Sequence, residues 1–185
     1  RSSDLALLVT DKGLRAIKDG AVDKTLGYLQ EAGIEVVVFD GVEPNPKDTN
    51  VRDGLAVFRQ EQCDIIVTVG GGSPHDCGKG IGIAATHEGD LYRYAGIDTL
   101  TNPLPPIVAV NTTAGTASEV TRHCVLTNTQ TKVKFVIVSW RNLPSVSIND
   151  PLLMLGKPAP LTAATGMDAL THAVEAYISK DANPV

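Results

Sequence analysis

A carboxylate and an imidazole four residues apart are the most specific pair of reactive side chains in this sequence. Asp168 and His172 lie in the segment GMDALTHAVEAY, and residues at positions i and i+4 share one face of a helix. This mixed oxygen and nitrogen pair can bind one Fe²⁺, Mn²⁺ or Zn²⁺ ion. It also fits an ordinary aspartate beside a histidine that faces the protein core. Two ligands are too few for a complete metal site, so both interpretations stay open at this point.

A glycine-rich turn is the second candidate site. Residues 65–69 (IIVTV) are apolar or β-branched, which predicts a strand buried on both faces of a parallel sheet. Glycines at 70–72 follow, and then Ser73 and Pro74, which predict a helix with Ser73 as its N-cap. Glycines let a ligand approach the backbone, and a helix N-terminus attracts an anion. The turn is therefore a candidate phosphate site, although it lacks the GxGxxG and P-loop patterns and also fits a tight turn without a ligand.

Further polar side chains lie near this turn or on a later predicted strand. Asp76 falls in the first turn of the predicted helix, where the helix dipole favours it and where it would also reach the ribose or nicotinamide of a bound cofactor. The loop at 111–119 (NTTAGTASE) offers hydroxyl groups that suit either ligand contacts or hydrogen bonds within the loop. Lys134 lies on a predicted strand and also fits an ordinary exposed lysine.

Predicted strands and helices alternate along most of the chain. We expect strands at 5–10, 34–39, 65–69 and 107–110, separated in the first half by helices at 22–32, 49–60 and 73–85. This alternation predicts crossover units and a mainly parallel sheet. Because ligands bind outside the carboxyl ends of such strands, the polar residues after each strand favour a nucleotide site.

The last third of the chain has a different pattern. A polar turn at 129–132 and a strand at 133–138 predict a hairpin, and Asp150-Pro151 marks another turn. Residues 162–179 have helical spacing. We therefore place a domain boundary near Pro151, with one domain at 1–151 and the start of a second at 152–185.

Composition excludes several classes of function. Hydrophobic residues make up 43% of the sequence, as in a globular protein with a buried core. The net charge of −5 and the lack of a basic run argue against a nucleic-acid partner or an anionic membrane surface. No apolar stretch approaches the roughly 20 residues of a membrane span. Three cysteines without a CxxC motif predict small buried residues in a cytoplasmic protein.

Four motifs in order resemble the iron-containing (group III) alcohol dehydrogenase family. They read GGGSPHDCGKG, NTTAGTASEVTR, KVKFVIVS and AATGMDALTHAVEAY, and the resemblance extends from about Leu5 to the last residue. It implies an α/β fold with a Rossmann-like, mainly parallel sheet and flanking helices, followed by the start of an all-helical metal-binding domain. It also implies NAD and Fe²⁺ in the cleft between the two domains, and a homo-oligomeric full-length protein.

The activity that this resemblance implies is NAD-dependent, iron-assisted hydride transfer between a small alcohol and its aldehyde. The expected pair is 1,3-propanediol and 3-hydroxypropanal. One alternative is another alcohol dehydrogenase of the same superfamily, such as a lactaldehyde reductase or a zinc-dependent glycerol dehydrogenase. A second alternative is a nucleotide-binding module without catalytic activity.

The resemblance also implies roles for individual residues in cofactor binding. The pyrophosphate would lie on Gly71, Gly72 and Ser73, with Asp76 beside the nicotinamide half. The remaining cofactor-lining residues implied are Asn45 and Leu153 at the adenosine, together with Thr112, Thr113, Thr116, Thr121 and Lys134.

Two arguments place the ribose-binding carboxylate differently. The general rule for Rossmann folds puts it at the end of the second strand, which is Asp40. The family resemblance implies Asp11, which follows the first strand. We adopt Asp11, whose charge would disfavour the 2′-phosphate of NADP.

The resemblance favours the metal-ligand interpretation of the carboxylate and imidazole pair. Asp168 and His172 match the first two metal ligands of the family, and the other two are histidines that this sequence does not contain. We therefore expect the chain to be a fragment that is inactive by itself.

Overall fold

The structure is a computed structural model that describes residues 5–180 and 182. A five-stranded sheet lies at its centre, and every neighbouring pair of its strands is parallel. The strand order is β2-β1-β3-β5-β8. The bounds are Leu5–Val9 for β1, Glu35–Phe39 for β2, Ile65–Gly70 for β3, Ile107–Asn111 for β5 and Val146–Ile148 for β8. The mainly parallel, Rossmann-like sheet predicted from the sequence is confirmed.

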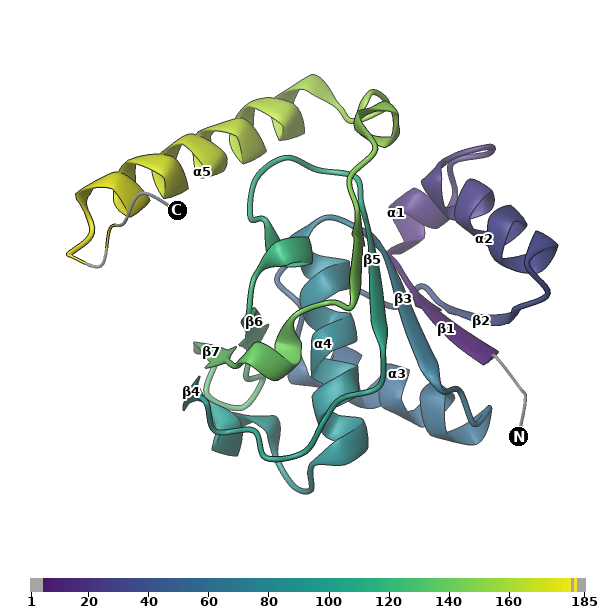
Figure 1. Cartoon of the computed structure of the whole chain (residues 1–185), viewed down its shortest axis with the longest axis horizontal. Helices are drawn as coiled ribbons and strands as arrows, with labels where there is room; N and C mark the ends of the chain where they lie inside the picture. Colours follow the sequence, from purple (N-terminus) through teal and green to yellow (C-terminus); the bar gives the residue numbers. More distant parts are fainter. Residues whose placement is uncertain (1–4, 181, 183–185) are drawn as a thin grey trace.

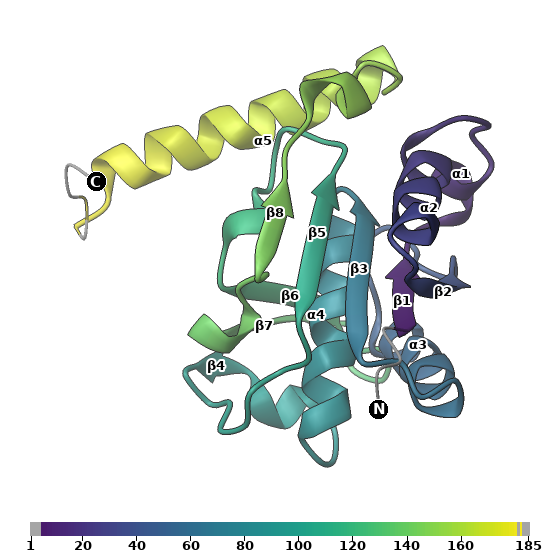
Figure 2. The same ribbon diagram turned by 45° about the vertical axis from the view of Figure 1, so that its right-hand side comes forward.

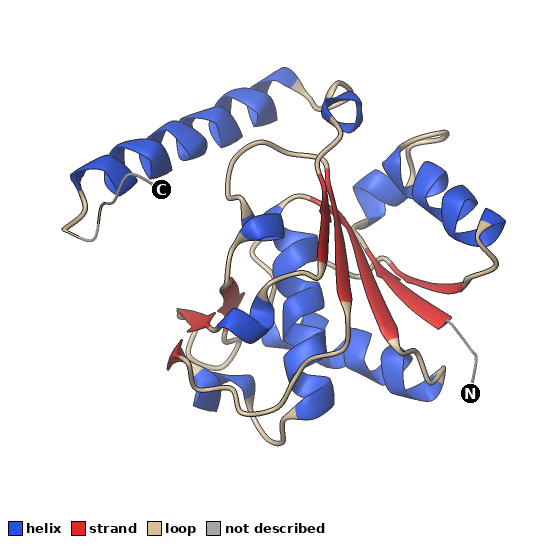
Figure 3. Ribbon diagram, viewed as in Figure 1, coloured by secondary structure: helices blue, strands red, loops and turns tan. Residues whose placement is uncertain are grey.

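Helices flank this sheet on both faces (Figure 1). Helices α1 and α2 lie on one side, and α3 and α4 lie on the other, where a second, three-stranded sheet of order β4-β7-β6 also packs. Figure 3 shows the same layers by type of element. The helix bounds are Lys12–Arg15 for α1, Ala21–Glu31 for α2, Asp48–Gln60 for α3, Gly72–Thr86 for α4 and Ala159–Ile178 for α5. The small sheet comprises β4 (Gly96–Ile97), β6 (His123–Thr127) and β7 (Lys134–Val138).

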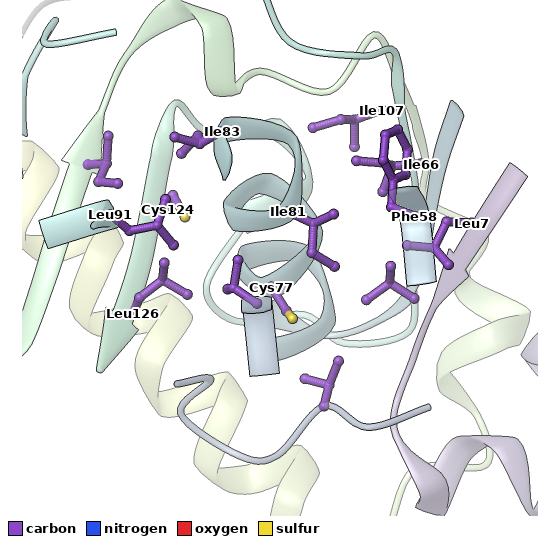
Figure 4. Packing of buried hydrophobic residues seen from close by; sticks show 14 of the residues in the cluster. Leu7, Phe58, Ile66, Cys77, Ile81, Ile83, Leu91, Ile107, Cys124 and Leu126 are labelled. Atoms are coloured by element: carbon purple, nitrogen blue, oxygen red, sulfur yellow. The ribbon is translucent and has the colours of Figure 1, made fainter. Parts of the chain in front are cut away.

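The side chains of β1 alternate between two apolar clusters, as the two-residue period of a strand requires. Leu7 and Val9 join the cluster on the α3 and α4 side, whereas Ala6 and Leu8 join the cluster on the α2 side. Figure 4 shows the larger cluster, in which α4 contributes Ile81 and neighbouring residues between the sheet and the β6 strand. On β3, Ile66 joins the first cluster and Val67 and Val69 join the second, so the predicted burial of residues 65–69 on both faces is confirmed.

Helix α4 packs closely against the sheet. Residues 74–83 are all buried, and a Cβ atom added at Gly78 would overlap the Cγ2 atom of Thr68 on β3. Because α4 starts directly after β3, this close contact fixes the position of its N-terminus against the carboxyl end of the sheet.

The predicted helices and strands agree with the structure to within a few residues, with one difference at the site. Helix α4 begins at Gly72 with Gly71 as its N-cap, so the prediction that Ser73 is the N-cap is wrong. Gly71 adopts the extended conformation of a cap, which places Ser73 inside the first turn. The predicted hairpin is present as the antiparallel pair β6 and β7.

Several short elements were not predicted. Strand β8, helix α1 and strand β4 are each four residues or shorter, so their hydrophobic period is too brief to detect. The same holds for the 3₁₀ helices η1 (Leu91–Tyr94), η2 (Ser118–Val120), η3 (Trp140–Asn142) and η4 (Pro151–Met154).

Helix α5 begins above the carboxyl edge of the sheet and projects away from it (Figure 2). Its apolar residues are largely exposed, including Met167, Leu170 and Val174. Proline in its first turn is compatible with a helix start, which explains why the helix begins at Ala159, before the predicted residue 162. Over residues 5–180 and 182, no helix combines the length and apolar character needed to cross a membrane.

Candidate functional site

The order of the strands creates a point where the chain changes direction across the sheet. From β1 the chain moves to β2 on one side, and from β3 it moves to β5 on the other side. Ligands of open parallel sheets bind outside the carboxyl ends of the strands at such a point. Asp11 follows β1 and the glycine turn follows β3, so both lie at this position.

The glycine turn leads into a helix N-terminus without a side-chain cap from the described residues. Gly70 has a φ angle of +148°, a conformation that only glycine adopts without strain. No described side chain caps the N-terminus of α4, so the first-turn amides keep their donor capacity. These amides, together with the helix dipole, form a favourable place for an anion.

A threonine-containing loop packs directly onto this turn. A Cβ atom at Gly71 would lie 2.7 Å from Thr113 Oγ1, and one at Gly72 would lie 2.8 Å from Thr116 Oγ1. The amide of Thr112 donates to the carbonyl of Gly70 at 2.9 Å. The structure therefore brings together five predicted site residues (Gly71, Gly72, Thr112, Thr113 and Thr116), and a side chain at either glycine would collide with the loop.

Asp11 lies at the end of β1 as the N-cap of α1. Its Oδ1 atom accepts a hydrogen bond from the amide of Leu14 at 2.9 Å, and its backbone forms a bridge with Gly41. Asp40 immediately precedes Gly41, so the two candidate ribose-binding carboxylates lie at the ends of adjacent strands.

Asn45 and Lys134 are brought together from distant parts of the chain. Lys134 Nζ donates to Asn45 Oδ1 at 2.7 Å, and the backbone of Asn45 has a positive φ angle of 55°. The amide of Thr127 donates to the carbonyl of Pro46 at 2.9 Å, which ties this loop to β6. Leu153, in contrast, packs against the apolar cluster on the α2 side of the sheet.

Asp76 is buried beneath the threonine-containing loop. Its Oδ1 atom accepts a hydrogen bond from Ser118 Oγ at 2.8 Å. Burial raises the pKa of this carboxyl group to about 6, although Lys79 and Ser118 act in the opposite direction.

Lys79 is a component of the site that the sequence analysis missed. Its side chain is fully buried, and its Nζ atom donates to the carbonyl oxygens of Ser118 (2.6 Å), Thr121 (2.9 Å) and His123 (2.8 Å). Burial lowers the pKa of this ammonium group, and the charge of Asp76 raises it. A detectable signal existed, because Lys79 follows Asp76 by three residues in a helix that is otherwise small and apolar. Thr121, predicted to line the cofactor, thus contributes its main-chain carbonyl to Lys79.

His75 is buried in the first turn of α4. Its Nδ1 atom lies 2.7 Å from Thr68 Oγ1, and its Nε2 atom makes no hydrogen bond to any residue that the structure describes. Burial, followed by the charge of Lys79, lowers the pKa of His75 to about 4, so the imidazole is neutral near pH 7.

The carboxylate and imidazole of α5 lie on one face of the helix, as predicted. Asp168 Oδ1 and His172 Nε2 are 3.8 Å apart, and both side chains are about half exposed. Within the described part of the chain, no cluster of three or more histidine, cysteine, aspartate or glutamate residues is arranged to hold a metal ion. The donor types and the shared face fit a metal such as Fe²⁺, but they supply only part of a ligand set.

Comparisons with known proteins agree with this geometry. The family described as iron-containing alcohol dehydrogenase matches residues 2–151, and its C-terminal family matches residues 162–185. The curated 1,3-propanediol dehydrogenase of Klebsiella pneumoniae is 94% identical over 180 residues, which cover 97% of this chain and 46% of that protein. The chain thus spans about half the length of this curated relative.

Solved structures show the same similarity. A crystal structure of 1,3-propanediol oxidoreductase has a TM-score of 0.95 and 92% identity, covering 98% of this chain and 47% of the other. Sulfoacetaldehyde reductase from Bifidobacterium kashiwanohense, solved in complex with NAD+, has a TM-score of 0.83 and 34% identity, covering 97% of this chain and 47% of the other.

Proposed function

The chain belongs to the iron-containing alcohol dehydrogenase family, and we propose that it forms the NAD-binding part of a 1,3-propanediol dehydrogenase. In this proposal the whole protein transfers hydride between 1,3-propanediol or 3-hydroxypropanal and the nicotinamide. The 94% identity to the Klebsiella protein supports this substrate pair over lactaldehyde. The family relation to a reductase solved with NAD+ supports the cofactor.

One observation carries the assignment of a dinucleotide. The uncapped N-terminus of α4 follows a glycine turn at the carboxyl end of β3, where the direction of the chain changes across the sheet. Gly71, Gly72 and Ser73 are proposed to bind the pyrophosphate through their backbone amides. Thr112, Thr113 and Thr116 come from the loop packed onto this turn, and their hydroxyl groups are proposed to line the same ligand.

Asp11 is proposed to select NAD over NADP. Its carboxylate lies at the end of β1, beside the strand that carries the glycine turn. A negative charge there accepts hydrogen bonds from the ribose hydroxyls of NAD and repels the 2′-phosphate of NADP. Asn45 and Lys134 are proposed to bind the adenosine side of the cofactor, with Leu153 and Thr121 as further contacts.

The proposed metal is Fe²⁺, held in part by Asp168 and His172. When bound, the ion supplies Lewis acidity toward the substrate oxygen. The described residues provide two donors and no third, so the remaining ligands must come from other residues. We accordingly assign residues 1–151 to the NAD-binding domain and 152–185 to the start of the metal-binding domain. We also propose that the full-length protein is a cytoplasmic homo-oligomer.

Calorimetric titration with NADH and NADPH tests the cofactor proposal. We expect the 185-residue chain to bind NADH and to bind NADPH at least about tenfold more weakly, as a single unfavourable charge contact of about 1.4 kcal/mol requires. Asp11→Asn keeps the oxygen that caps α1 but removes the charge, and it should reduce the difference in affinity between NADH and NADPH. Asp40→Asn is the matched control, because it removes the rival carboxylate on the neighbouring strand and should leave this difference unchanged.

Failure of the chain to bind NADH would contradict the proposal. If Asp40→Asn reduced the difference in affinity between NADH and NADPH and Asp11→Asn did not, the ribose-binding carboxylate would be Asp40. The substrate is tested separately, by NADH oxidation in the full-length protein loaded with Fe²⁺. Faster reduction of lactaldehyde than of 3-hydroxypropanal would show that the substrate pair is wrong. The 185-residue chain itself should bind NADH without oxidising it.

A further inference from the structure

A buried lysine ties the loop at 112–123 to helix α4. Lys79 Nζ donates to the carbonyl oxygens of Ser118, Thr121 and His123 at 2.6–2.9 Å, and to the hydroxyl group of Ser118 at 3.1 Å. An ammonium group has three N–H donors, so these four acceptors use its full capacity, and two of them share one N–H. All three residues lie within a span of six: Ser118 and Thr121 precede β6, and His123 is its first residue.

The charge of this lysine is balanced by a neighbour on the same helix. Asp76 lies one turn before Lys79, and Ser118 connects them, because its hydroxyl group donates to Asp76 at 2.8 Å and lies 3.1 Å from Lys79 Nζ. The thiol of Cys124 donates to the carbonyl of Asp76 at 3.3 Å. Hydrogen bonds satisfy the buried ammonium group, and the nearby charge of Asp76 stabilises its charged form.

The anchored loop is the one that covers the glycine turn. Near its start, the amide of Thr112 is bonded to the carbonyl of Gly70 at 2.9 Å. Thr113 and Thr116 then lie against the two following glycines, and Ser118 reaches Lys79 two residues later. The threonine side chains are thus held between two attachments, one to the end of β3 and one to the interior of α4.

We propose that Lys79 is a positioning residue for dinucleotide binding, which holds the threonine loop over the glycine turn through its three carbonyl contacts. This inference rests on the proposed NAD site, because the loop matters for function only if a dinucleotide binds at the turn. Lys79 itself is fully buried, so its side chain has no exposed surface with which to contact a ligand. If Lys79 only neutralised the charge of Asp76, the affinity for NADH would change differently in a double variant of the two residues.

The test compares Lys79→Met with Lys24→Met. Methionine keeps an unbranched apolar side chain in the buried position, and Lys24 is an exposed lysine on α2, remote from the loop. We expect Lys79→Met to raise the dissociation constant for NADH about tenfold or more, since charged hydrogen bonds are each worth about 1.5–3 kcal/mol. Lys24→Met should leave it unchanged. Hydrogen exchange of the unliganded chain should become faster in residues 112–123 of Lys79→Met, with β1 and β3 still protected.

A double variant separates positioning from charge neutralisation. Asp76→Asn removes the charge that Lys79 balances, so the comparison is between Asp76→Asn alone and Asp76→Asn with Lys79→Met. If the lysine positions the loop, the double variant binds NADH about tenfold more weakly than Asp76→Asn alone. Equal affinities of the two would overturn the inference, because neutralisation would then explain the role of Lys79.

The hydrogen-exchange result keeps this inference distinct from the proposed function. If the unmodified chain does not bind NADH, the proposed function fails. Exchange in residues 112–123 then decides whether Lys79 anchors the loop at all. Unchanged exchange in Lys79→Met would overturn the anchor regardless of the ligand.

Discussion

The neutral histidine beneath the glycine turn should make the stability of the chain fall in mild acid. His75 is almost completely buried, and burial lowers its pKa from an ordinary value of 6.5 to about 4. Between these two pH values the unfolded chain binds a proton at this imidazole and the native chain does not. The contribution of His75 to stability is therefore fully present above pH 6.5 and is lost as the pH falls toward 4.

The size of this loss follows from the two pKa values. Each pH unit between them corresponds to about 1.4 kcal/mol, so the full effect is about 3 kcal/mol. Lowering the pH from about 7.5 to about 5 covers most of this range, and the expected loss is about 2 kcal/mol. The variant His75→Gln keeps a polar side chain but cannot titrate, so it lacks this contribution at every pH.

Urea unfolding of both proteins over this pH range measures the effect. The free energy of unfolding of the unmodified chain should fall relative to that of His75→Gln as the pH decreases. Taking the difference between the two proteins cancels the titration of groups that both contain. Parallel pH dependences would refute the reasoning, because they would mean that His75 titrates alike in the native and unfolded states.

Two further predictions concern the same helix. The comparison with Asp76→Asn should show a pH dependence of opposite sign. Burial raises the pKa of Asp76 from 3.8 to about 6, so between these values the native chain keeps a proton that the unfolded chain has lost. The free energy of unfolding of the unmodified chain should therefore fall by up to about 3 kcal/mol relative to that of the variant as the pH rises from about 4 to 7. Urea unfolding at a series of pH values measures this, and a loss toward acid pH would contradict it. Gly78→Ala should destabilise the chain by about 1–3 kcal/mol, because the new Cβ would overlap Thr68. Its control, Gly27→Ala on α2, has no atom within 4 Å of the new Cβ and should stabilise the helix by about 0.5–1 kcal/mol. Thermal unfolding measures both effects, and equal unfolding midpoints of the two variants would contradict the close packing of α4.

The order and type of the longer elements could be predicted from the sequence because buried positions are occupied by apolar residues in a recognisable pattern. Residues 65–69 are apolar or β-branched on both faces, and the structure buries them between the layers on either side of β3. Elements of four residues or fewer, such as α1 and β8, are too short to show a hydrophobic pattern, and the place of β8 depends on its pairing with β5.

Parts of the candidate site could also be predicted, because each part lies within a single segment of the chain. The glycine turn and the pair of Asp168 and His172 depend only on neighbours along the chain. The N-cap was misassigned to Ser73, since serine is the preferred cap by type, while the conformation of Gly71 depends on the loop packed against it.

The sequence by itself determined that a parallel sheet carries a glycine turn into a helix, and that a carboxylate and an imidazole share a later helix. Only the tertiary structure decided what holds the turn's surroundings in place. Lys79 meets its three carbonyl partners 39 to 44 residues further along the chain. The physical reason is that a buried ammonium group requires acceptors wherever the fold brings them, and nothing in the local sequence specifies which carbonyls these are.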